Sequence, residues 1–190
     1  MPKVGMEPIR RDAIVRATIA ELGVQKSLDV TVSQIAKRAG MSSALAHHYF
    51  GGKDQIFLAA MRQILTDFGK EARTELATAA PDQRAQAIIR ACFAHSCFTP
   101  DVIAAWMTFY VLAQTNDDAL RLWKVYQARI RSNLIHALRP QIAEPINAAE
   151  TMIALIDGLY IHSALSAPEE PQLAANHALR VLNTLLEGEK

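Results

Sequence analysis

The chain has 190 residues, of which 51% are hydrophobic and 21% are charged, and its formal net charge is +1. This composition is too apolar for a disordered protein, and the length suffices to bury the core of one large or two small domains. The sequence contains neither an apolar run of about 18 residues nor an N-terminal apolar segment after a basic start. We therefore expect a cytoplasmic protein without a membrane span or signal peptide.

The charge is distributed unevenly along the chain. Residues 1–62 include nine lysines and arginines but five acidic residues, so this part carries +4 and the remainder carries −3. A basic N-terminal part attached to an acidic remainder is typical of a polyanion-binding head on a second module. The asymmetry supports that function but does not establish it.

Apolar residues recur at every third or fourth position throughout, which predicts an all-α fold of about nine helices. The first helix is predicted to end at Gly23. The second begins at Thr31, whose side chain can form a capping box with Gln34. Ser42 caps the third helix, which ends at Gly51-Gly52, and a long fourth helix runs from about residue 53 to residue 78.

Five further helices are predicted in the second part of the chain. They cover residues 81–98, 101–114, 117–139, 147–166 and 171–187, and the breaks between them fall at Thr99-Pro100, Asn116, Pro140 with Pro145, and Ala167-Pro168. The break near residue 50 separates three short helices from longer ones. We therefore predict an N-terminal domain of residues 1–52 and a second helical domain of residues 53–190.

The two short helices joined by Ala39-Gly40-Met41 are the first candidate for function. A glycine in so tight a connection lets two helices pack at a steep angle, as in a helix-turn-helix. By itself the arrangement fits an ordinary helical hairpin equally well. The second helix has a small, polar and aromatic surface, which includes His47 and His48. Neighbouring histidines on a helix point about 100° apart, so this pair does not indicate a metal site.

The segment "TVSQIAKRAGMSSALAHHYFGGKDQIF", preceded by "RRDAIVRATIAELG", resembles the TetR family of repressors. It matches the pattern Thr-x-x-x-Ile-Ala-x-x-Ala-Gly-hydrophobic-Ser, followed by an exit of the form aromatic-Phe-x-x-Lys. The resemblance implies that the second helix enters the DNA major groove, and that a homodimer binds a near-palindromic operator in double-stranded DNA.

This resemblance also assigns roles to individual positions of the motif. Base contacts and nearby groups fall on Ser43, Ala44, Leu45 and His47, phosphate contacts fall on Tyr49 and Lys53, and the remaining DNA-binding candidates are Thr31, Ser33, Ser42 and His48. Position 47 departs from the family pattern, in which tyrosine is frequent. The operator sequence therefore cannot be inferred from the motif.

Aromatic residues gather at helical spacing in the second part of the chain. Trp106, Phe109 and Tyr110 share one helix face, and Trp123 and Tyr126 share another. Such groups fit a hydrophobic core, but with a nearby carboxylate such as Asp157 they also suit a cage for a quaternary ammonium ion. Both interpretations stay open on the residues alone.

Segments spread over almost the whole chain resemble BetI-type repressors of glycine-betaine synthesis. They are "MPKVGMEPIRR", "SSALAHHYFGGKD", "AAWMTFYVLAQ", "YQARIRSNL" and "ALIDGLYIHSALS". Repressors of this type control genes for choline uptake and for its oxidation to betaine, an osmoprotectant, and they respond to choline. The alternatives are a repressor with another inducer, such as a drug, lipid or metabolite, and a helical ligand-binding or scaffold protein that does not bind DNA.

The last two predicted helices are candidates for the dimer surface. The candidate residues are Ile153, Ile156 and Tyr160 on the first helix and His177, Val181 and Leu185 on the second. With their symmetry mates these faces form a four-helix bundle, and the alternative is that they serve only the core of one chain.

No catalytic or cofactor motif is present in the sequence. Cys92 and Cys97 lie on different faces of one predicted helix, so we interpret them as buried free thiols rather than as a disulfide. His95 lies between them but lacks a second pair of zinc ligands at a standard spacing. We therefore predict that the protein is not an enzyme and needs no cofactor.

Overall fold

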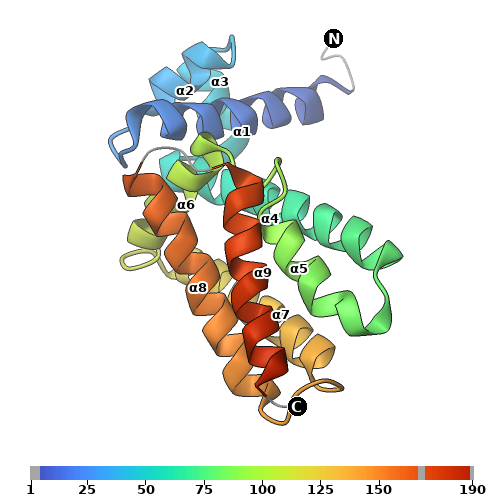
Figure 1. Cartoon of the computed structure of the whole chain (residues 1–190). Coiled ribbons are helices and arrows are strands. Elements are labelled where there is room, and N and C mark those ends of the chain that lie inside the picture. The colour runs from blue at the N-terminus through green and yellow to red at the C-terminus, as the bar shows by residue number, and fades with distance from the viewer. Residues whose placement is uncertain (1–4, 167–169, 189–190) are drawn as a thin grey trace. The chain divides into compact units, whose positions relative to one another are not determined.

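The structure is a computed structural model that describes residues 5–166 and 170–188. These residues form nine α-helices and one short 3-10 helix, with no strand among them (Figure 1), which confirms the all-α prediction. The elements are α1 (Met6–Gln25), α2 (Val32–Arg38), α3 (Ser43–Phe50), α4 (Lys53–Thr78), η1 (Pro81–Gln83), α5 (Arg84–Cys92), α6 (Pro100–Leu112), α7 (Asp117–Leu138), α8 (Pro145–Leu165) and α9 (Pro171–Glu187). Across the described part of the chain, no helix has the length and apolar character that a membrane span requires.

The chain forms two compact units. The first comprises the residues up to Ile64 together with Pro100–Leu120, and the second comprises Leu65–Thr99 together with the residues from Arg121 onward. α6 therefore belongs to the same unit as α1, α2 and α3, although it lies far from them in sequence. The compact units do not divide the chain at residue 52, so the boundary between residues 1–52 and 53–190 remains a prediction about function.

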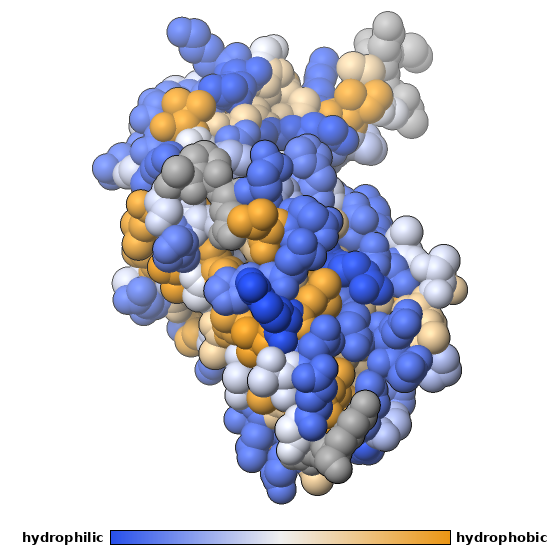
Figure 2. Space-filling view, viewed as in Figure 1, coloured by the Kyte–Doolittle hydropathy of each residue, from blue (hydrophilic) through white to orange (hydrophobic). Residues whose placement is uncertain are grey.

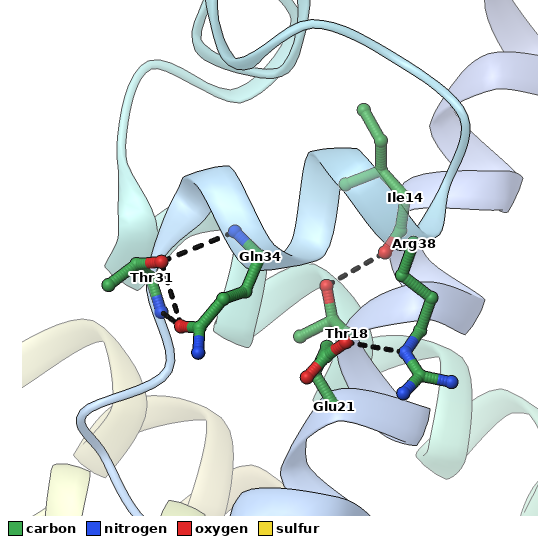
Figure 3. Close-up of polar contacts among 6 residues, drawn as sticks. All are labelled: Ile14, Thr18, Glu21, Thr31, Gln34 and Arg38. Atoms are coloured by element: carbon green, nitrogen blue, oxygen red, sulfur yellow. Dashed lines mark hydrogen bonds and ion pairs between the residues drawn. The ribbon is translucent and has the colours of Figure 1, made fainter.

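Two predicted N-caps hold the short helices α2 and α3. The Gln34 amide N–H donates to Oγ1 of Thr31 at 3.2 Å, and the Thr31 amide N–H donates to Oε1 of Gln34 at 2.7 Å, which completes the capping box (Figure 3). Oγ of Ser42 accepts the amide N–H of Leu45 at 3.2 Å. Gly40 has a φ of 67°, a conformation that favours glycine, in the turn between the two helices. These local predictions are confirmed.

The predicted end of the first helix at Gly23 is wrong. α1 continues to Gln25, and its C-cap is Lys26, whose amide N–H donates to the Leu22 carbonyl oxygen at 2.9 Å. A Cβ atom added at Gly23 would lie 2.9 Å from Cα of Asp101, closer than Cβ atoms approach in real structures. The glycine therefore permits close packing of α1 against the start of α6 instead of ending the helix.

The helix predicted over residues 81–98 is shorter than expected. It comprises η1 and α5 and ends at Cys92, so Cys97 lies in the turn that follows. The Tyr160 hydroxyl lies 2.6 Å from the carbonyl oxygen of Cys92 and 2.9 Å from that of Cys97, so its one proton serves two acceptors. The Phe98 ring meets the Tyr160 ring edge-on, with 4.9 Å between centroids. A residue of α8 thus completes the end of α5. Both cysteines are buried free thiols, as predicted.

Candidate nucleic-acid interface and ligand site

An ion pair holds the supporting helix α2 on α1. Nε of Arg38 donates to Oε1 of Glu21 at 2.6 Å, and Glu21 is only 8% exposed (Figure 3). One turn earlier on α1, the Thr18 hydroxyl donates to the Ile14 carbonyl oxygen at 2.7 Å. A charge-assisted hydrogen bond to a buried carboxylate is short and directional. This pair therefore orients α2, and through the Gly40 turn it constrains where α3 lies.

The predicted recognition helix α3 presents small and polar side chains to solvent. Ala44, His47 and His48 are exposed, and Ser43 and Leu45 are half-buried. Nδ1 of His47 lies 3.3 Å from the carbonyl oxygen of Gly51 at the end of the same helix. Because small side chains such as Ala44 and Ser43 lie on this face, the helix backbone can come close to base edges in a groove.

The beginnings of α2 and α3 come together at two of the predicted DNA-binding residues. The hydroxyls of Ser33 and Ser43, which lie on different helices, are 3.1 Å apart and share a hydrogen bond. Thr31 and Ser42 cap these same two helices and are exposed. The four side chains thus form one polar surface, in which each hydroxyl also has a structural contact within the chain.

Two arginines of α1 contact the end of α3, and the sequence reasoning did not include them. Nη1 of Arg10 donates to the Tyr49 hydroxyl at 3.4 Å, and Nη1 of Arg11 donates to the Tyr49 carbonyl oxygen at 2.5 Å. The Arg11 guanidinium also lies over the Phe50 ring, 4.6 Å from its centroid. Both cations therefore stand beside Tyr49, a predicted phosphate contact. In the sequence, the pair Arg10-Arg11 indicates only a local positive charge. Its contact with Tyr49, 38 or 39 residues away, follows from no local pattern.

Lys53, the other predicted phosphate contact, is the first residue of α4. Its Nζ donates to the Leu28 carbonyl oxygen at 2.7 Å and lies 5.7 Å from the centroid of the Phe57 ring. A lysine ammonium carries three donors, so one bond within the chain does not exhaust them. The hydrogen bond to Leu28 fixes the position of the Lys53 ammonium group, which would otherwise move freely at the end of its side chain.

The predicted ligand-binding residues are divided between the two compact units. Trp106, Phe109 and Tyr110 lie on α6 in the first unit, whereas Trp123, Tyr126 and Asp157 lie on α7 and α8 in the second. Trp106 and Phe109 are 5% and 2% exposed, and their ring centroids are 6.0 Å apart. The Trp106 and Tyr110 centroids are 5.6 Å apart. These three side chains therefore form one aromatic cluster along α6.

In the second unit, aromatic, acidic and hydrogen-bonding groups of α7 and α8 lie close to one another. Nε2 of Gln127 donates to Oδ2 of Asp157 at 3.4 Å, and the Tyr126 ring packs edge-on against Phe68 of α4, with 5.9 Å between centroids. Burial, the Cys97 thiol and the charge of Asp157 raise the pKa of the Cys92 thiol, in that order of size. The negative charge of Asp157 therefore acts on groups inside the second unit, such as the Cys92 thiol.

The predicted dimer residues do not all face outward. Ile156 and Tyr160 are 3% and 7% exposed within a single chain, so we assign both to the core of the second unit. His177 is exposed, and Ile153, Val181 and Leu185 are half-buried. The prediction for the dimer surface therefore keeps these four residues. Because α8 carries apolar residues on most of its circumference, the sequence does not show which side of it faces inward.

A different stripe of α8 is exposed. Its members recur at helical spacing and are small or apolar: Ala154, Gly158, Ile161 and Leu165. Leu165 is 84% exposed, and Leu173 on α9 is 62% exposed. Figure 2 shows apolar patches between polar side chains over α8 and α9 on this face of the second unit. In the sequence, two small residues followed by two apolar residues at helical spacing indicate this surface, which the sequence analysis did not predict.

Comparison with known proteins gives the family. Residues 14–60 match the model of bacterial regulatory proteins of the tetR family, and residues 81–189 match the model of the C-terminal part of BetI-type transcriptional repressors. The HTH-type transcriptional regulator BetI of Brucella suis biovar 1 (strain 1330) is 49% identical over 183 residues, which cover 94% of this chain and 91% of that protein. The chain belongs to the TetR family.

Other relatives and solved structures agree with this assignment. The BetI regulator of Agrobacterium fabrum is 43% identical and aligns over 100% of this chain and 96% of its own length. A transcriptional regulator from Pseudomonas aeruginosa PAO1 has the same fold, with a TM-score of 0.79, 24% identity and coverage of 95% and 92% of the two chains. A regulator from Saccharomonospora viridis, solved in complex with choline, has a TM-score of 0.73, 20% identity and coverage of 93% and 95%.

This TetR-family protein is thus a BetI-type transcriptional repressor. Regulators of the family bind DNA and dimerise and are not enzymes, so the predictions of a DNA-binding dimer without catalytic activity are confirmed at that level. The roles of individual side chains in DNA, ligand and dimer contacts remain predictions.

Proposed function

We propose that this repressor controls genes for choline uptake and for the synthesis of glycine betaine, and that choline releases it from its operator. The observation that carries the proposal is the BetI-type match over residues 81–189, which covers most of the chain outside the DNA-binding head. The choline bound to the Saccharomonospora viridis regulator supports the choice of inducer. A repressor must reach the DNA that it controls, so we expect this protein to act in the cytoplasm.

The chemistry of the candidate ligand residues suits a quaternary ammonium ion. An aromatic face attracts such a cation by about 0.5 to 2 kcal/mol, depending on how far it is desolvated. Asp157 supplies a carboxylate in the same unit as Trp123 and Tyr126. Glycine betaine carries its own carboxylate, which Asp157 repels. We therefore expect the site to prefer choline over betaine.

The protein has one arrangement that binds DNA and another that does not. To lower DNA affinity, the inducer must bind the second arrangement more tightly than the first. One route is α6, because this helix packs along α1 in the first unit and carries Trp106, Phe109 and Tyr110. A second route is α4, a continuous helix from Lys53 to Thr78. A coupling free energy of about 1 to 3 kcal/mol by either route changes operator affinity by about 5- to 150-fold.

The proposed dimer surface comprises Ile153, His177, Val181 and Leu185. The exposed stripe of α8 extends it with Ala154, Gly158, Ile161 and Leu165. Small residues at positions 154 and 158 let a partner helix approach closely. Such a dimer places two copies of α3 on one near-palindromic operator. Replacing Gly158 by Arg should yield a monomer by analytical ultracentrifugation, and a variant that stays dimeric would contradict this surface.

Two measurements test the proposed function. A gel shift should use the upstream regions of the genes for choline uptake and betaine synthesis, at a stated salt concentration. It should show a discrete protein–DNA complex that dissociates on addition of choline but not of betaine. Calorimetry should show binding of choline but weaker binding of 3,3-dimethylbutanol, which has the same shape without the charge. Equal heats for both ligands, or no binding of either at millimolar concentration, would leave a TetR-family repressor that answers to another small molecule.

A further inference from the structure

Trp123 carries a hydrogen-bond donor that no described residue of the chain accepts. Its indole Nε1 is shielded from solvent and has no hydrogen-bond partner among the residues that the structure describes. Buried polar groups in native proteins are almost always paired, because an unpaired donor forgoes its hydrogen bonds to water. An unpaired indole N–H therefore indicates a group that another molecule completes.

The surroundings of this donor identify the chemical class of that molecule. On α7, Gln127 lies one helical turn after Trp123 and therefore on the same side of the helix. The Gln127 amide N–H donates to Oδ2 of Asp157 at 3.4 Å, so the Asp157 carboxylate of α8 reaches the side of α7 that carries Trp123 and Gln127. Tyr126, next to Gln127, adds an aromatic ring that packs against Phe68. A donor, a negative charge and aromatic faces together suit a cation that also carries an oxygen acceptor.

We propose that the Trp123 N–H donates to the hydroxyl oxygen of the inducer, while Asp157 and the aromatic rings attract its ammonium group. The inference rests on the proposed function and deepens it, because it separates recognition of the oxygen from recognition of the charge. Trp123 then determines specificity for choline over quaternary ammonium ions that lack oxygen. An aliphatic cation of the same size binds, but it leaves the indole N–H unpaired.

The test compares two ligands of the same shape on the wild type and on Trp123→Phe. Choline and n-propyltrimethylammonium differ only in a hydroxyl that replaces a methyl group. Phenylalanine keeps an aromatic face but removes the N–H. Calorimetry should show that the preference for choline over the propyl compound falls by about three- to tenfold in Trp123→Phe, the range expected for one neutral hydrogen bond.

Trp106→Phe is the matched control, since it makes the same chemical change at the other tryptophan of the chain. It should change the dissociation constants of both ligands by the same factor. An unchanged ligand preference in Trp123→Phe, or a loss of preference in Trp106→Phe instead, would overturn the assignment while choline remained the inducer. If the wild type bound neither cation at millimolar concentration, the proposed inducer and this inference would fail together.

A third ligand tests the inference without any substitution. Methoxyethyltrimethylammonium has an ether oxygen, which accepts a hydrogen bond but cannot donate one. If the indole N–H donates to the inducer, this compound should bind wild-type protein more tightly than butyltrimethylammonium, in which a methylene replaces the oxygen. Equal affinities of the two would show that no donor of the protein recognises the oxygen, which contradicts the role of Trp123.

Discussion

Replacing Gly23 by Ala separates the two reasons for a glycine near the end of a helix. Gly23 lies inside α1, so alanine would be favoured there by about 0.5 to 1 kcal/mol if nothing packed against the glycine. The structure shows a packing role instead. An added Cβ lies 2.9 Å from Cα of Asp101, and Asp101 side-chain atoms are nearer still. The side chain can rotate away, whereas a backbone atom moves only if the start of α6 moves.

The packing cost should exceed the helix-propensity gain. Extra atoms forced into a well-packed contact cost about 1 to 3 kcal/mol, so Gly23→Ala should lower the free energy of unfolding by about 1 to 2 kcal/mol. For a chain of 190 residues, about 2 to 4 °C of melting temperature correspond to each kcal/mol. The variant should therefore melt roughly 2 to 8 °C below the wild type.

Gly69→Ala is the matched control inside α4. The nearest atom of the described residues that its added Cβ meets is Nη1 of Arg73 at 3.5 Å, an ordinary van der Waals contact. This variant should melt about 2 °C above the wild type, since only the propensity gain remains. Circular dichroism should follow melting at one protomer concentration, because dimerisation makes the melting temperature depend on concentration. A Gly23→Ala protein as stable as wild type would refute the packing argument.

Four further outcomes are expected. Lys53→Ala should weaken operator and random DNA alike and lower the slope of log K against log salt by about 1, which titrations at several salt concentrations would detect; loss for the operator alone would contradict a phosphate contact. His47→Ala should change the ranking of operator variants, with about 1 to 3 kcal/mol at the base that it contacts; an equal loss for every sequence would indicate a backbone contact. Tyr160→Phe should lower the free energy of unfolding in urea by about 1 to 3 kcal/mol, because the carbonyls of Cys92 and Cys97 both lose its proton; an unchanged midpoint would contradict this. Burial, more than the charges of Glu71 and Asp67, raises the pKa of Cys97 from 9.0 to about 11 despite the opposing hydrogen bond from Ser96. The folded chain thus keeps this proton after the unfolded chain has lost it, so stability should fall as pH rises from about 9 to 11 and should fall less in Cys97→Ala; an equal decline in both proteins would contradict this.

The amino-acid sequence by itself determined the DNA-binding head closely. The capping box of Thr31 with Gln34, the cap at Ser42 and the turn at Gly40 each depend on contacts within about four residues. Such contacts form wherever those residue types stand at that spacing, so a pattern in the sequence predicts them directly. The all-α class follows for the same reason, from apolar residues repeated at helical spacing over the whole chain.

Only the tertiary structure decided which helix faces meet. Gly23 has the sequence signature of a helix end, yet α1 continues past it and the glycine lies against the start of α6. α5 ends at Cys92, and Tyr160, 68 residues later in the chain, supplies the proton that its terminal carbonyl accepts. The contacts of Arg10 and Arg11 with Tyr49 likewise depend on partners that no local pattern encodes. The same holds for the Trp123 N–H, which has no partner among the described residues. Side chains distant in sequence meet only through the packing of whole helices, and many packings are compatible with the same apolar periodicity.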